Sequence, residues 1–296
     1  MRQTRPLVLL SAGFCLVSLV LYGCTSSTVD VSDEGLFPAK KGRSGAETLA
    51  PLEYTGTATI TGTVEYDGEP PPRPELESIF QHADRPVCVQ GDVRDQTWMV
   101  QDGKVANVVV FVRPPKGFYF KKPQDSEKSW ADEVVVDQPY CQFIPHVVVL
   151  YPQYREGGQL VRTGQVLKVL NSAPIGHNIK VAGSSDSNPA SGATLSARSG
   201  VYIFDKIVVD RRELTMNCDV HKWMTGYALT FDHPYAAVTN EKGEYTIKNV
   251  PAGVELTLRG WHEALKPGFD PPVDGGTKIR LTAGETRVLN FKIKRK

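Results

Sequence analysis

The chain has 296 residues, with 34 Lys and Arg against 33 Asp and Glu, and a formal net charge of +1. Its 41% hydrophobic content and balanced charge exclude a mostly disordered protein. Nucleic-acid binding needs a cationic face, so we expect no nucleic-acid partner. The length predicts about two domains.

The N-terminus is typical of a secretory signal peptide. Arg2 and Arg5 precede an apolar run, residues 7–22, which serine and glycine interrupt and which is short for a membrane span of about 20 residues. The run ends in Leu-Tyr-Gly-Cys at residues 21–24, which resembles the bacterial lipobox. The resemblance implies that residues 1–23 are removed as a signal peptide and that Cys24 is acylated. Ordinary cleavage and a retained anchor helix are the alternatives.

Residues 24–52 contain Ser, Thr, Gly, Lys and Asp with little periodicity, which predicts a flexible tether. Together with the lipobox, this segment predicts an exported lipoprotein that is held on a membrane by its lipid and faces the periplasm or the cell surface. Such a chain folds in an oxidising compartment, where disulfides are permitted.

Most of the remaining chain predicts β-strands. Alternating or β-branched runs recur between Gly, Pro, Asn and Asp, and the best helical period is at Glu75 to Phe80. This pattern predicts an all-β fold of antiparallel sandwiches rather than βαβ units. The predicted strands are 57–66, 105–112, 133–137, 147–151, 165–170, 178–182, 201–210, 213–216, 227–231, 244–250, 254–261 and 287–294.

Two boundaries, near residues 130–134 and 233–238, divide the folded part of the chain into three. We predict an N-terminal β module at 53–133, a central domain at 134–232 and a C-terminal β module at 233–296.

The cysteines are odd in number once the signal peptide and the lipobox are set aside. Cys88, Cys141 and Cys218 remain. An unpaired thiol in an exported protein needs an explanation. Cys88 and Cys141 stand near prolines at the ends of strand-like segments, which suits a structural disulfide.

Cys218 belongs to a different pattern. His221 and Met224 follow it at spacings of three residues, and His177 precedes it by 218 − 177 = 41 residues. One thiolate, two imidazoles and one thioether are the ligands of a type-1 copper site. We expect Cys218 to end a strand, His221 and Met224 to lie on the loop that follows, and His177 to arrive from another strand end. A copper ligand at Cys218 would leave Cys88 and Cys141 to pair.

The residues around this pattern resemble the cupredoxin family. His177-Asn178 after an Asn-containing turn, and Cys-x2-His-x2-Met before a strand, are similar to cupredoxins, and the short loop is most similar to that of amicyanin. Cys141-Gln-Phe-Ile-Pro-His, followed by valines, resembles the Phe-x-Pro strand of plastocyanin-like domains. The resemblance covers roughly 134–232 and implies a Greek-key sandwich that holds copper.

A second resemblance lies downstream. Residues 243–263 resemble a carboxypeptidase-regulatory-like β-sandwich. The combination is similar to exported cupredoxin-type proteins that are labelled methylamine-utilisation-like, a label that does not establish a methylamine pathway.

The cupredoxin resemblance implies a role for each ligand. Cys218 would bind copper as a thiolate, His177 would be buried, and Met224 would tune the reduction potential through a long bond. We expect His221 at the exposed rim, as the exit for the electron.

Other interpretations of the same residues stay open. Zinc could bind Cys218 and the two histidines, although Met is a poor zinc ligand. A catalytic Cys–His pair, a structural cysteine and a cupredoxin scaffold that has lost its metal are further alternatives. His146 could approach the copper as a neighbour, whereas His233 and His262 have structural explanations.

The predicted function is that of a one-electron carrier, not an enzyme, with copper as its cofactor and unidentified redox proteins as its partners. One alternative is a surface-binding or scaffold protein for a carbohydrate or protein ligand, in which copper is incidental. Another is copper storage or delivery.

Overall fold

The computed structural model describes residues 49–265 and 276–293. The predicted signal peptide at 1–23, the acylated Cys24 and nearly all of the predicted tether at 24–52 lie outside the described residues. Within the described part of the chain, every helix is too short or too polar to cross a bilayer. The all-β prediction is confirmed, because strands form nearly all of the regular structure.

The helices are few and short. They are α1 (Glu77–Phe80), α2 (Arg85–Cys88) and the 3₁₀ turn η1 (Asp125–Glu127). The strands are β1 (Ala50–Pro51), β2 (Thr57–Tyr66), β3 (Val100–Gln101), β4 (Lys104–Val105), β5 (Val109–Arg113), β6 (Phe118–Tyr119), β7 (Glu133–Val136), β8 (Val147–Leu150), β9 (Gln153–Glu156), β10 (Gln159–Arg162), β11 (Val166–Asn171), β12 (His177–Ala182), β13 (Ser191–Leu195), β14 (Gly200–Phe204), β15 (Leu214–Asn217), β16 (Thr225–Thr230), β17 (Ala236–Val238), β18 (Glu244–Pro251), β19 (Glu255–Trp261), β20 (Thr277–Arg280), β21 (Thr286–Val288) and β22 (Phe291–Ile293).

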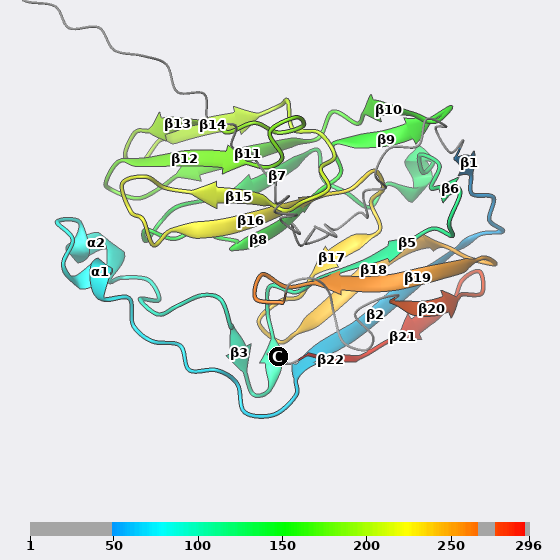
Figure 1. Ribbon diagram of the computed structural model, residues 1–296, viewed down its shortest axis with the longest axis horizontal. Coiled ribbons are helices and arrows are strands. Elements are labelled where there is room, and N and C mark those ends of the chain that lie inside the picture. The colour runs from blue at the N-terminus through cyan, green and yellow to red at the C-terminus, as the bar shows by residue number, and fades with distance from the viewer. Residues whose placement is uncertain (1–48, 266–275, 294–296) are drawn as a thin grey trace, which may run out of the picture. The chain divides into compact units, whose positions relative to one another are not determined.

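The central part of the chain forms one sandwich, which we term the central sandwich. Its sheets are a five-stranded one in the order β13-β12-β15-β16-β8 and a three-stranded one in the order β14-β11-β7 (Figure 1). Alternate residues of β11 and β12 are buried, because successive side chains of a strand point to opposite faces. The core between the two sheets therefore receives every second residue of these strands.

Most of the remaining strands form a second sandwich, whereas β1 with β6 and β9 with β10 form two-stranded sheets of their own. One sheet is built around β2, which pairs with β18 antiparallel and with β21 and β22 in parallel, and which continues through β4 to β3. The other sheet has the order β17-β5-β19-β20. Strands from the predicted modules 53–133 and 233–296 thus share both sheets, which corrects their separation into two modules. Neither range alone supplies two layers for a core, so the two close one together.

The two sandwiches meet in an apolar cluster. Val109 and Phe111 of β5 and Trp261 of β19 pack with Val147 of β8 and with Leu229 of β16. Beside this cluster, Nε2 of His146 lies 2.6 Å from Oε1 of Glu263, and both side chains are nearly buried. The contact therefore combines apolar packing with one polar pair.

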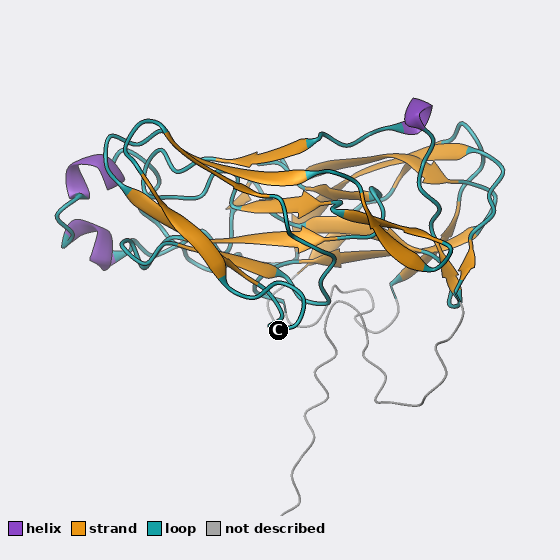
Figure 2. Ribbon diagram, turned by 90° about the horizontal axis from the view of Figure 1, so that it is seen from above, coloured by secondary structure: helices purple, strands orange, loops and turns teal. Residues whose placement is uncertain are grey.

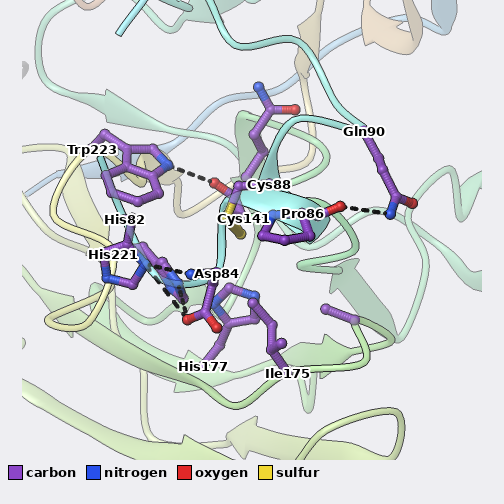
Figure 3. The surroundings of a disulfide bond; sticks show 12 residues. His82, Asp84, Pro86, Cys88, Gln90, Cys141, Ile175, His177, His221 and Trp223 are labelled. Atoms are coloured by element: carbon purple, nitrogen blue, oxygen red, sulfur yellow. Dashed lines mark hydrogen bonds and ion pairs between the residues drawn. A yellow bond between two sulfur atoms is a disulfide. The ribbon is translucent and has the colours of Figure 1, made fainter. Parts of the chain in front are cut away.

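Residues 77–88, which we term the cap, leave the second sandwich between β2 and β3. Figure 2 shows the two helices of the cap at one end of the strands. Ile79 and Cys88 belong to the buried core of the central sandwich, and Cys88 forms a disulfide with Cys141 (Figure 3). The cap was predicted as part of the N-terminal module, but its side chains pack on the central sandwich.

Candidate metal centre

Strand periodicity brings two of the predicted ligands into the core. His177 is the first inward-facing residue of β12, ahead of Ile179. Leu214 and Met216 are the inward-facing residues of β15, and Cys218 continues their period by two residues. Because β12 and β15 are antiparallel neighbours, the start of β12 lies beside the end of β15.

The loop between β15 and β16 carries the other two. The amide of Met224 donates to the carbonyl of His221 at 2.8 Å, and the amide of Cys218 approaches the carbonyl of Met224 at 3.4 Å. These two bonds close residues 218–224, which we term the ligand loop, into a compact turn. Met224 is buried in the same core cluster as Cys218.

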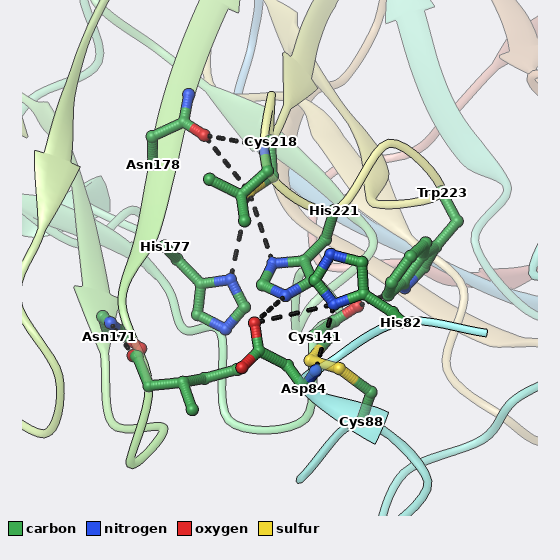
Figure 4. Close-up of polar contacts among 12 residues, drawn as sticks. His82, Asp84, Cys88, Cys141, Asn171, His177, Asn178, Cys218, His221 and Trp223 are labelled. Carbon is green, nitrogen blue, oxygen red and sulfur yellow. Dashed lines mark hydrogen bonds and ion pairs between the residues drawn. A yellow bond between two sulfur atoms is a disulfide. The ribbon is translucent and has the colours of Figure 1, made fainter. Parts of the chain in front are cut away.

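The two imidazoles converge on the sulfur. Sγ of Cys218 lies 3.9 Å from Nδ1 of His177 and 3.7 Å from Nδ1 of His221 (Figure 4). The centroids of the two rings are 4.6 Å apart. Both histidines are 0% exposed and the cysteine is 2% exposed, so the group is closed to water. These three residues form a group that could hold a metal ion.

Asn178 fixes the beginning of the ligand loop. Its Oδ1 accepts the amide of Asp219 at 2.7 Å, and its Nδ2 donates to the carboxylate of Asp219 at 3.0 Å. The same Oδ1 lies 3.2 Å from Sγ of Cys218. Asn178, which follows His177 in the sequence, therefore holds in place the backbone that follows Cys218.

Burial keeps both imidazoles neutral at neutral pH. Desolvation lowers the pKa of His177 to about 4, and the pKa of His221 is also lowered by burial. Nε2 of His177 is buried and has no hydrogen-bond partner among the described residues. A histidine must be neutral to bind a metal, so the site offers imidazoles in the required state.

The donor set fits copper. Cys218 is the free cysteine among the described residues, since Cys88 and Cys141 are joined to each other. One thiolate, two imidazoles and a nearby thioether suit copper, whereas structural zinc takes four Cys or His ligands. Among the described residues, the group around Sγ of Cys218 contains one cysteine and two histidines, one Cys or His ligand short of a structural zinc site.

The structure corrects the expected exposure of His221. Its Nε2 lies 3.0 Å from Oδ2 of Asp84, and the ring of His82 lies 4.7 Å from its own ring. The ring of Trp223 lies 5.2 Å away on the same loop. His221 is covered because the cap packs over the Nε2 edge of its ring. That edge would face solvent if His221 were the exposed exit for the electron.

Sequence analysis missed His82 and Asp84. They form a second group with His221 whose possible ligand atoms lie within 4.8 Å of one another. The one available signal was their position a few residues before Cys88, because the predicted disulfide with Cys141 would bring this segment to the central domain.

The other histidines lie apart from the sulfur. His146 pairs with Glu263 between the sandwiches and is not part of the ligand group. The ring of His262 stacks on Trp98 at 4.3 Å, and His233 is buried. These three side chains therefore have structural surroundings.

Comparison with known proteins gives structural neighbours only. No protein-family model and no curated protein matches the chain. A reduced proline-to-phenylalanine variant of amicyanin is similar at 14% identity and a TM-score of 0.25, over 41% of this chain and 99% of that one. Amicyanin from Paracoccus versutus (Thiobacillus versutus) is similar at 14% identity and a TM-score of 0.26, over 40% and 97%. A Cu(I) structure of a methionine-to-alanine amicyanin variant has 11% identity and a TM-score of 0.26, over 40% and 98%.

Identity and TM-scores this low leave the inference about function to the residues of the chain itself. The lipobox and the carboxypeptidase-regulatory-like resemblance stay predictions.

Proposed function

We propose that the chain is a type-1 copper protein that carries single electrons between redox partner proteins. One observation supports this most directly: Nδ1 of His177 and Nδ1 of His221 both face Sγ of Cys218 within 3.9 Å, in a buried site. This is the His₂Cys donor set of type-1 copper, and Met224 belongs to the same buried core cluster as Cys218.

Each residue has a role in this proposal. Cys218 would bind as a thiolate, His177 and His221 through Nδ1, and Met224 as the weak axial ligand. The bound copper would supply one-electron exchange between Cu(I) and Cu(II). The strands hold the donors in place, Asn178 fixes the loop, and burial excludes water, so the donors need to move little between the two oxidation states. The chain would act as a carrier rather than an enzyme.

We also propose that the protein is exported and held on a membrane through an acylated Cys24. The Cys88–Cys141 disulfide supports folding in an oxidising compartment.

Addition of Cu(II) to the purified, metal-free protein tests the copper site. We expect the intense visible charge-transfer band of a copper–thiolate bond and its loss in Cys218→Ser. His233→Asn is the control, because His233 is a buried histidine outside the ligand group and its replacement should leave the band unchanged. A colourless protein that takes up Zn²⁺ tightly and shows no band after copper exchange would contradict the proposal.

Copper storage is the second candidate, and the buried position of His221 favours it. A carrier should be reduced and reoxidised repeatedly with no loss of copper. A storage protein should instead release its copper to a chelator or partner upon reduction, so measuring copper content after redox cycling separates the two functions.

A further inference from the structure

The cap places a carboxylate on the far side of one proposed ligand. Nδ1 of His221 faces the sulfur of Cys218, and Nε2 lies 3.0 Å from Oδ2 of Asp84 (Figure 4). The histidine side chain is 0% exposed and that of Asp84 is 32% exposed. The imidazole thus bridges the buried donor group and a carboxylate at the edge of the site.

Several contacts hold Asp84 in this position. The disulfide between Cys88 and Cys141 fastens the end of the cap to the central sandwich. The amide of Asp84 donates to Nδ1 of His82 at 3.2 Å. The ring of His82 packs against the rings of His221, at 4.7 Å, and Trp223, at 5.3 Å.

The ligand loop is also held in place, through Trp223. Nε1 of Trp223 donates to the carbonyl of Cys141 at 3.2 Å, so the ring that covers His221 is tied to the residue that carries the disulfide (Figure 3). The cap and the ligand loop are therefore joined through the same short segment around Cys141.

The contact with Asp84 selects one tautomer of His221. A neutral histidine carries one N–H, and a carboxylate acceptor at Nε2 places the proton there and leaves the lone pair of Nδ1 free. Outer carboxylates of this kind orient metal-bound histidines and raise their basicity. A more basic ligand and a nearby negative charge stabilise Cu(II) more than Cu(I).

We infer that Asp84 is a positioning residue of the copper centre, which holds His221 with Nδ1 toward the metal and favours Cu(II). The inference rests on the proposed copper site. It adds one residue from outside the central sandwich, Asp84, to the groups that set the reduction potential.

The test replaces Asp84 by Asn, which keeps the size of the side chain and removes its charge. We expect Asp84→Asn to keep the visible copper band and to weaken Cu(II) binding relative to Cu(I) about tenfold, which raises the reduction potential by about 59 mV. Glu77→Gln is the matched control, because it removes one negative charge from an exposed position of the same cap. Its potential should stay close to that of the unchanged protein.

A second measurement needs no metal. Nitrogen NMR of the metal-free protein reports the tautomer of His221, and we expect the proton on Nε2 in the unchanged protein and a mixture of tautomers in Asp84→Ala. A copper band with equal potentials in Asp84→Asn and Glu77→Gln, or a His221 tautomer that Asp84→Ala leaves unchanged, would overturn this inference and leave the proposed function intact. Absence of the band in the unchanged protein would instead contradict the copper site.

Discussion

Removal of the Cys88–Cys141 disulfide should destabilise the protein strongly and release the cap. The two cysteines are separated by 53 residues in sequence. The chain-entropy relation assigns a closed loop of this length about 4 kcal/mol at 25 °C, because the cross-link restricts the unfolded chain. We therefore expect the Cys88→Ala, Cys141→Ala double variant to lose about 4 kcal/mol in its free energy of unfolding.

Urea unfolding of the metal-free protein measures this loss, and amide hydrogen exchange locates it. The amides of Cys88 and Val89 donate to carbonyls of Asp84 and Arg85, so they should lose protection when the cap is released. Cys218→Ala is the control, since it removes a buried thiol without opening the loop. A loss below about 1 kcal/mol, with both amides still protected, would refute the idea that the disulfide fastens the cap.

Three further predictions concern acid stability, strand packing and the anchor. Burial lowers the pKa of His233 to about 4, below its value of about 6.5 in an unfolded chain, so unfolding takes up a proton and stability falls as the pH drops through this window. His233→Asn should remove about 2 kcal/mol of the loss between pH 7 and pH 4.5, measured by urea unfolding, and an unchanged loss would contradict this. A Cβ at Gly192 would lie 1.8 Å from the carbonyl oxygen of Ile179, so Gly192→Ala should cost about 3 kcal/mol by the same assay; a cost near zero would show that β13 can shift. Cys24→Ala should abolish labelling by palmitate and release the protein from membranes, whereas unchanged membrane partition would exclude the lipid anchor.

Strand positions were predictable where side chains alternate. Residues 57–66 form β2 as expected, with every second residue buried over most of its length. The predicted strand at 201–210 ends at Phe204, however. Beyond it, the guanidinium of Arg162 donates to the carbonyls of residues 205–207, which satisfies backbone acceptors without a neighbouring strand. The β-branched residues at 207–209 favoured a continuing strand and gave no indication that Arg162 bonds these carbonyls.

The convergence of the proposed ligands was predictable because their spacing is local or follows the strand period. Cys218, His221 and Met224 lie within one short loop, and the thiol continues the inward face of β15. Asp84 could not be found in this way, because 137 residues separate it from His221 and no periodicity connects them. The pairing of β2 with β18 is equally remote in sequence, which is why the two flanking segments read as separate modules.

The proposed ligands and the surroundings of His221 come from different parts of the chain. All four proposed ligands belong to the central sandwich, between His177 and Met224. The cap belongs to the connection between β2 and β3 of the second sandwich, and the packing of Trp261 and the His146–Glu263 pair hold that sandwich against the central one. A central sandwich alone would keep its donors but lose Asp84 and the partner of Cys141. The second sandwich therefore contributes to the proposed copper site through the cap, which covers His221 and places the carboxylate of Asp84 at the outer edge of its ring.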